Sequence, residues 1–231
     1  MLKLMRLELR KFGLKPYVRS AVIGTILIFI LVSCLTMNAQ MRASLPLSSY
    51  PMTFSIIDTL VRGMYIVFAA VILSRLIIGE FQNKTMALMF TYPINRKKMM
   101  AAKLLFVLLF TFIANIISCL LIGAGFAVLN HMEGVIPGLL TWPVTERFLL
   151  VVFMNALATS FLSLIPLYFG MRKHSVATTI TSSVIVAALV CQNIDGKTLY
   201  SIIAVPIALA LLGAVIAYMS IRNIENVGLV N

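Results

Sequence analysis

Six apolar runs dominate the sequence, and the short stretches between them hold most of the charged residues. Each run approaches the roughly 20 residues that an α-helix needs to cross the hydrocarbon core of a bilayer. Apolar residues make up 61% of the 231-residue chain and charged residues 11%, far from the composition of soluble proteins. We therefore predict an all-α polytopic membrane protein with one transmembrane domain over residues 1–231. The expected spans are Val18 to Met37, Asp58 to Ile78, Leu104 to Asn130, Phe148 to Phe169, Val176 to Cys191 and Tyr200 to Ser220.

Lysine and arginine are unevenly distributed between alternate loops, and this distribution predicts the orientation of the chain. Because these residues accumulate in short cytoplasmic loops, we expect the three richer segments, and with them both termini, to lie in the cytoplasm. The richer segments hold Lys3, Arg6, Arg10, Lys11, Lys15, Lys84, Arg96, Lys97, Lys98, Lys103, Arg172 and Lys173, whereas the segments between them hold Arg42, Arg147 and Lys197. Since the basic residues flank apolar runs, the formal charge of +12 does not indicate nucleic-acid binding.

No motif for catalysis, nucleotide binding or metal binding stands out. The nearest approach to a phosphate-binding loop is Gly196-Lys197-Thr198, but Cys191 stands where the upstream glycine is required, so we interpret it as an ordinary turn. The cysteines lie in or beside apolar runs, and neither histidine has an acidic or histidine partner at helical spacing. We therefore expect no catalytic residues, no metal and no cofactor bound by this chain.

The N-terminal residues 1–17 combine apolar and basic residues at helical spacing. This pattern is typical of a helix that lies in the headgroup plane of a membrane, and we predict such an interfacial helix here. A basic flank without fixed structure is the alternative. The apolar positions are Leu2, Met5, Leu9 and Phe12, and the neighbouring basic positions are Lys3, Arg6 and Arg10.

The loop after the second span, residues 79–98, is too apolar and too regular for a simple connector. A short helix is predicted first, because Phe81, Thr85, Leu88 and Met89 share one helical face. Tyr92-Pro93 ends that helix, and a new helix is expected to start with Arg96 in its first turn. An apolar helix of this kind on the cytoplasmic side suits insertion into a groove of a partner protein.

The same stretch resembles the signature of ABC-2 type transporter permeases. In that family an acidic residue leaves span two, a coupling helix follows, and Pro-x-x-Arg leads to Ala-x-Lys and span three. The positions that match are Glu80, Lys84, Thr85, Pro93, Arg96 and Lys103. The six spans and the N-terminal interfacial helix also resemble the family, and the short loops are similar to those of bacterial peptide-antibiotic immunity exporters, such as those for bacitracin and lantibiotics.

This resemblance implies the permease subunit of an ATP-driven exporter in a bacterial cell membrane. A separate ABC ATPase, which carries ATP and Mg, would bind the loop, and a second permease copy or a paralogue would complete the transporter. The cargo would be amphipathic peptides, such as antimicrobial peptides, or other hydrophobic compounds. The alternatives are a membrane sensor that works with an ATPase and an ion-coupled secondary transporter. The implied ATPase-coupling residues are Glu80, Phe81, Lys84, Thr85, Met86, Leu88, Met89, Phe90, Pro93 and Arg96.

Two charges inside the predicted second span form a further candidate site. Asp58 and Arg62 share one helix face and are expected to lie about one turn from the outer boundary of the membrane. They are interpreted either as part of a translocation path or as structural charges. Pro166 and Pro206 either kink spans four and six or are tolerated there as in ordinary spans.

Overall fold

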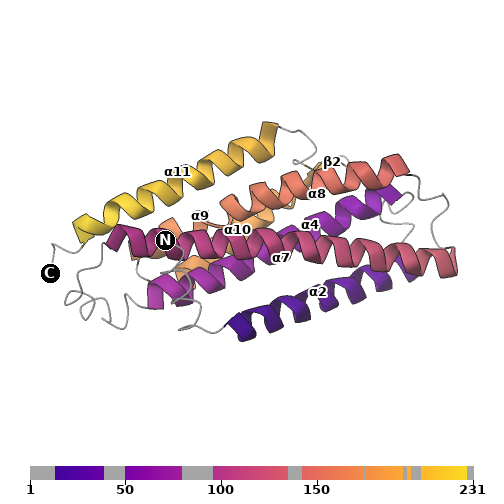
Figure 1. The fold of residues 1–231 in the computed structure, drawn as a ribbon, viewed down its shortest axis with the longest axis horizontal. Coiled ribbons are helices and arrows are strands. Elements are labelled where there is room, and N and C mark those ends of the chain that lie inside the picture. The colour runs from indigo at the N-terminus through magenta and orange to yellow at the C-terminus, as the bar shows by residue number, and fades with distance from the viewer. Residues whose placement is uncertain are drawn as a thin grey trace.

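The computed structural model describes residues 14–38, 50–79, 96–134, 142–173, 175–194, 197–198 and 204–227. In this part of the chain, long helices run side by side in one elongated bundle (Figure 1). The helices are α2 (Leu14–Met37), α4 (Tyr50–Leu73), the π-helix η1 (Ser74–Ile78), α7 (Arg96–Glu133), α8 (Trp142–Leu162), α9 (Ile165–Lys173), α10 (Val176–Val190) and α11 (Ala204–Val227). Two short strands, β1 (Asn193–Ile194) and β2 (Lys197–Thr198), pair antiparallel between α10 and α11.

Four stretches of helix are long and apolar enough to cross a membrane. They correspond to the first four predicted spans. The last two predicted spans form shorter apolar helices, Val176–Val190 and Pro206–Met219. The helical fold class is thus confirmed, with the small β1–β2 pair as an addition. The four longer stretches are Lys15–Met37, Tyr50–Ile78, Met99–Met132 and Val144–Lys173.

The second span begins earlier than the sequence predicted. Its helix starts at Tyr50, eight residues before Asp58, and Pro51 stands in the first turn, where a missing N–H costs nothing. Because the continuous helix Tyr50–Ile78 has 29 residues, its midpoint is Met64, and Arg62 lies two residues from it. The prediction that the span begins at Asp58 is therefore wrong, because Asp58 lies about two turns inside the helix.

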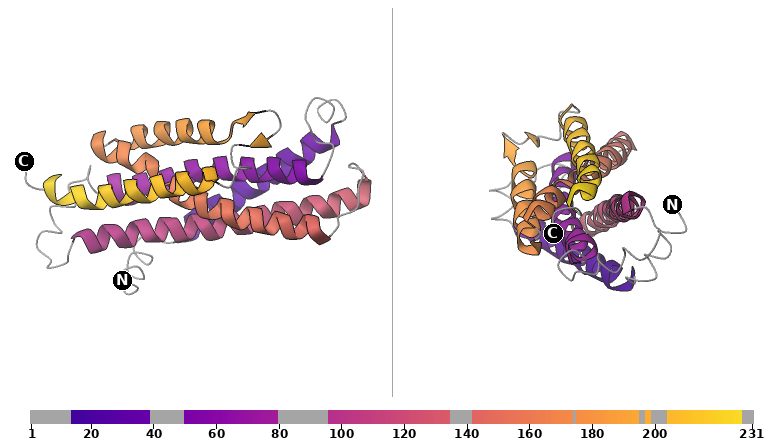
Figure 2. Two further views of the ribbon diagram at one scale, coloured as in Figure 1. Left: turned by 90° about the horizontal axis from the view of Figure 1, so that it is seen from above. Right: turned by 90° about the vertical axis from the view of Figure 1, so that its left-hand side faces the viewer.

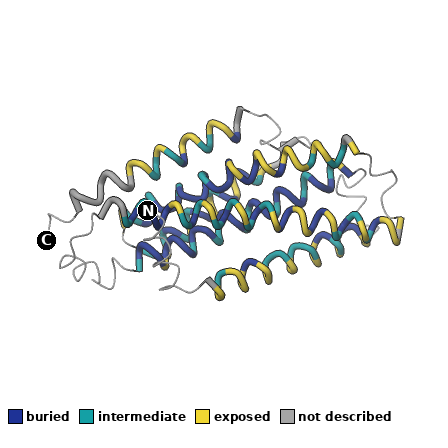
Figure 3. Tube along the Cα trace, in the orientation of Figure 1, coloured by how far each residue is buried: buried dark blue, intermediate teal, exposed yellow. Residues whose placement is uncertain are grey.

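Helix α4 is the central helix of the bundle. In the most apolar part of Tyr50–Ile78, 61% of the residues are buried, against 17% in the equivalent part of Lys15–Met37. Helices α2 and α11 lie on opposite sides of the bundle (Figure 2). The burial pattern agrees, because α4 is buried along most of its length while α2 and α11 present exposed residues on their outer sides (Figure 3).

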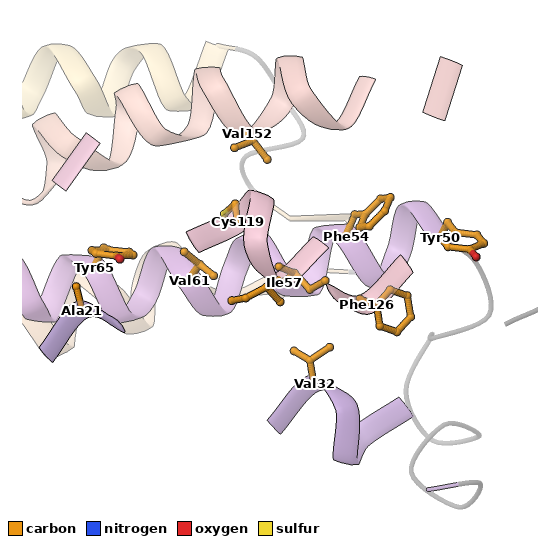
Figure 4. Packing of buried hydrophobic residues seen from close by; sticks show 11 residues of the cluster. Ala21, Val32, Tyr50, Phe54, Ile57, Val61, Tyr65, Cys119, Phe126 and Val152 are labelled. Carbon is orange, nitrogen blue, oxygen red and sulfur yellow. The ribbon is translucent and has the colours of Figure 1, made fainter. Parts of the chain in front are cut away.

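Three clusters of buried apolar residues hold the bundle together, and α4 contributes to each of them. In the first cluster, Tyr50, Phe54 and Phe126 lie near one end (Figure 4). The ring of Phe54 is also stacked on that of Phe148, with 4.3 Å between the ring centroids. Since lipid is as apolar as these side chains, close packing rather than exclusion from water stabilises such contacts within a membrane.

The fourth predicted span is broken where a proline interrupts it. Helix α8 ends at Leu162, a turn follows at Ser163 and Leu164, and α9 carries Pro166 in its first turn. Because proline has no N–H, it cannot donate to the carbonyl of Leu162, and the kink, the first of the two interpretations, is confirmed. Pro206 lies in the first turn of α11, where proline is tolerated, which agrees with the second of the two interpretations.

Candidate functional site

The predicted coupling element lies mainly outside the described residues. Arg96 is the exception, because it is the first described residue of α7. Most of the predicted interfacial helix, residues 1–13, also lies outside, while residues 14–17 belong to α2. The coupling residues outside the description are Glu80, Phe81, Lys84, Thr85, Met86, Leu88, Met89, Phe90 and Pro93.

The structure does describe the helices that precede and follow this element. The chain leaves the described part at Gly79, directly after η1, and re-enters it at Arg96, the first residue of α7. Lys103 of α7 is buried, and its Nζ donates a hydrogen bond of 3.2 Å to the carbonyl oxygen of Leu76 in η1. Helix η1 and the N-terminal part of α7 are therefore in direct contact through Leu76 and Lys103.

The two predicted intramembrane charges are brought together at the centre of the bundle. Arg62 donates to the carboxylate of Asp58, and the two side chains are only 1% and 6% exposed. Asn155 of α8 donates a second hydrogen bond, of 2.8 Å, to the same carboxylate oxygen. An isolated charge at the centre of a bilayer costs about 2.5 to 3.5 kcal/mol, and pairing with an opposite charge lowers such a cost for both groups. The cluster joins α4 to α8, and its burial keeps it from direct contact with a passing molecule.

A second buried polar contact joins three helices. The hydroxyl of Ser118 in α7 is hydrogen-bonded to Thr25 of α2 and to Tyr65 of α4, at 2.7 Å in each case. Further along the bundle, the side-chain amide of Asn130 in α7 donates to the hydroxyl of Tyr50 in α4. Hydrogen bonds of hydroxyl and amide groups thus join α2 to α7 and α7 to the central helix α4 at two positions along the bundle.

Sequence reasoning missed Asn155 and Ser118. For Asn155 a signal was available, since an amide in the middle of an apolar span needs a hydrogen-bond partner to be tolerated there. For Ser118 there was none, because a serine hydroxyl in a helix can bond to its own backbone. Within the described ranges no three His, Cys, Asp or Glu residues are grouped as metal ligands would be.

Comparison with known proteins identifies the family. A family model described as ABC-2 family transporter protein matches residues 4–189. The chain belongs to the ABC-2 transporter family. Over 224 residues this ABC-2 chain is also 38% identical to a protein of Bacillus subtilis (strain 168) named "Uncharacterized protein YcbO", a match that covers 97% of the chain and 98% of that protein. No solved structure matches it.

Family membership gives the general role of the chain. An ABC-2 chain is the membrane permease of an ABC transporter, and such permeases work with an ABC ATPase. The long apolar helices agree with a protein embedded in a membrane. The matched range 4–189 also includes all of residues 79–98, so the resemblance noticed in that loop belongs to a likeness that extends over most of the chain.

Proposed function

We propose that this ABC-2 chain is the six-span permease of an ATP-driven exporter and that residues 79–98 receive the motion of its ATPase. The observation that carries the proposal is a contact between the helices on either side of this segment. Helix η1 precedes the segment, α7 follows it, and the two are joined by the hydrogen bond between Lys103 and Leu76. A partner that binds the segment therefore acts on the chain that continues directly into α4, the most buried of the four longer stretches. ATP and Mg are bound by the partner, and this chain itself is not an enzyme.

Six crossings follow if α10 and α11 are added to the four longer stretches. Helix α10 has 15 residues, about 22 Å at 1.5 Å per residue, whereas the hydrocarbon core is about 30 Å thick. A short span is accommodated by local thinning of the bilayer. The packing of α10 against α4, and of α11 against α8, supports their place inside the membrane domain. An even number of crossings puts both termini on the same side of the membrane. The distribution of basic residues, among them Arg172 and Lys173, indicates that this side is the cytoplasm.

The proposed cargo is an amphipathic peptide, such as an antimicrobial peptide, or another hydrophobic compound. Two permease subunits, identical or paired with a paralogue, and two ATPases form the working transporter. The cargo then moves between the two permeases, because the charges buried within one chain are closed off by their own helices. The exposed apolar side chains of α2 and α7 provide a surface of the right chemistry for such cargo and for lipid.

The coupling assignment is tested by co-purification with candidate ABC ATPases from the same genome. We expect that replacing Met86, Leu88 and Met89 together by aspartate abolishes complex formation, because charged side chains are excluded from an apolar groove. Met132→Asp, at the other end of α7 and 78% exposed, is the matched control and should leave the complex intact. Retention of the complex by the triple variant would overturn the assignment.

Transport itself is tested in proteoliposomes that contain the complex, ATP and a fluorescent cationic peptide. Accumulation of the peptide that depends on ATP supports an exporter. Peptide-stimulated ATP hydrolysis without movement of the peptide would instead favour the sensor. Movement driven by an ion gradient in the absence of ATP would favour a secondary transporter.

A further inference from the structure

The inner end of α4 departs from regular α-helical geometry. Ser74–Ile78 form the π-helix η1, and the N–H of Gly79 donates to the carbonyl of Ser74, five residues earlier. A π-turn takes one more residue than an α-turn, is rare, and occurs mostly as a single wide turn at functional positions. This one stands immediately before the segment that is proposed to meet the ATPase.

Lys103 is bonded to this wide turn from a neighbouring helix. The side chain is 4% exposed, and its ammonium group lies 3.2 Å from the carbonyl oxygen of Leu76. A backbone carbonyl oxygen is a hydrogen-bond acceptor with partial negative charge, which favours a cation beside it. Burial of a cation without hydrogen-bond acceptors costs free energy, and the carbonyl oxygen of Leu76 in η1 is one such acceptor for Lys103.

The surroundings of this contact exclude water. Leu76 and Ile77 of η1 belong to the same buried apolar cluster as Met100 and Leu104 of α7. In such an environment a hydrogen bond is electrostatically stronger than in water. By contrast Arg75, the basic residue of η1 itself, is exposed and does not belong to this cluster. The two cations therefore stand at the same level of the bundle in opposite environments.

The hydrogen bond between Lys103 and Leu76 also closes a loop of the chain. It joins residues 27 apart in sequence, and the chain between them contains the whole segment 80–95. The bond thus joins the helix that precedes the segment to the helix that follows it, and it opposes separation of the two.

We propose that Lys103 is a positioning residue that makes α4 and α7 respond as one body to movement of the coupling segment. This inference rests on the proposed function for the role of the segment, but the clamp itself is a property of this chain alone. A force on residues 80–95 then moves α4 and α7 together instead of separating them.

The clamp is tested first without any partner, by hydrogen–deuterium exchange of the full chain in lipid nanodiscs. We expect Lys103→Met to accelerate exchange of the backbone amides of 74–79 by about tenfold, since local opening is no longer opposed by the clamp. Exchange in 57–66, at the middle of α4, should not change. Lys103→Arg, which keeps a donor, should stay near the wild type, as should Arg75→Met, which removes an exposed charge from the same turn. Unchanged exchange of 74–79 in Lys103→Met would overturn the proposal.

The second measurement is the amount of peptide transported per ATP hydrolysed by the complex. Lys103→Met should bind the ATPase and hydrolyse ATP but transport at least about fivefold less peptide per ATP, with recovery in Lys103→Arg. An unchanged ratio would overturn the role of Lys103 in transmission. If the wild-type chain binds no ATPase, the proposed function fails, whereas the exchange experiment still decides whether the clamp exists.

Discussion

The side-chain amide of Asn155 donates a hydrogen bond of 2.8 Å to the carboxylate of Asp58, which lies 97 residues earlier in the chain. The same carboxylate oxygen accepts from Arg62, so one acidic group in α4 satisfies both a cation of its own helix and an amide of α8. Because the pair is nearly fully buried, its charges are balanced by neighbouring protein groups rather than by water. Asp58 therefore accepts hydrogen bonds from both Arg62 and Asn155.

Removal of Asp58 should therefore be costly. We expect Asp58→Leu to lower the free energy of unfolding by about 3 to 5 kcal/mol, because it removes the carboxylate that balances Arg62. The double variant Asp58→Leu/Arg62→Met should be clearly more stable than Asp58→Leu, since no buried charge is left. Asn155→Leu, which removes only the amide bond, should cost about 1 kcal/mol. Unfolding of the four proteins in mixed micelles measures these differences, and equal stability of the single and double variants would contradict the expectation.

The Ser118 hydroxyl should be worth more than either of its partners. Ser118→Ala removes the bonds to both Thr25 and Tyr65 and is expected to cost about 1 kcal/mol, whereas Tyr65→Phe removes one bond and should cost about half as much. In the Ser118→Ala background, Tyr65→Phe should have little further effect, because that bond is already lost. A full additional cost in the double variant would show that the Tyr65 hydroxyl acts through another group.

Gly213 sets how closely α11 approaches α8. A Cβ at this position would collide with the backbone carbonyl of Phe161, which cannot move aside as a side chain does. Gly213→Ala is therefore expected to push α11 outward and to lower stability by about 1 to 3 kcal/mol. Leu212→Ala, on the outward face beside it with 54% exposure, is the matched control and should change stability by less than about 0.5 kcal/mol. Equal effects of the two substitutions in thermal unfolding would refute this account.

Trp142 provides a test of the proposed orientation. It is the single tryptophan of the chain, begins α8 and is 81% exposed. If the N-terminus is cytoplasmic, a cysteine at this position should react in intact cells with a maleimide that does not cross membranes. Arg172→Cys, at the other end of Val144–Lys173, should react only after the cells are opened. Both variants are made with exposed Cys34 replaced by serine, and the reverse pattern of labelling would invert the topology.

The parts of this fold that follow from local hydropathy were predictable, and those that depend on distant contacts were not. The start of span two was misplaced because Pro51 and Ser55 look like loop residues, yet both lie within α4. The partner of Asp58 from α8 and the bond between Lys103 and η1 involve residues far apart in sequence, and no spacing rule connects them. The π-turn was not foreseen either, since an apolar stretch of this kind is equally compatible with a regular helix. The coupling residues of 80–95 stay predictions.

Helix α2 is the least buried of the four longer stretches, and this has a consequence for how the protein is made. It is synthesised before the helices against which it packs, and its mean hydropathy of 2.4 is high enough for lipid alone to hold it. Its insertion by the translocation machinery therefore does not have to wait for the rest of the chain. Helix α4 carries a buried acidic and a buried basic residue, and lipid alone does not stabilise them. The amide of Asn155 that bonds to Asp58 belongs to α8, which is synthesised later. Biogenesis of this protein should thus be limited by the retention of its second span and not by its first.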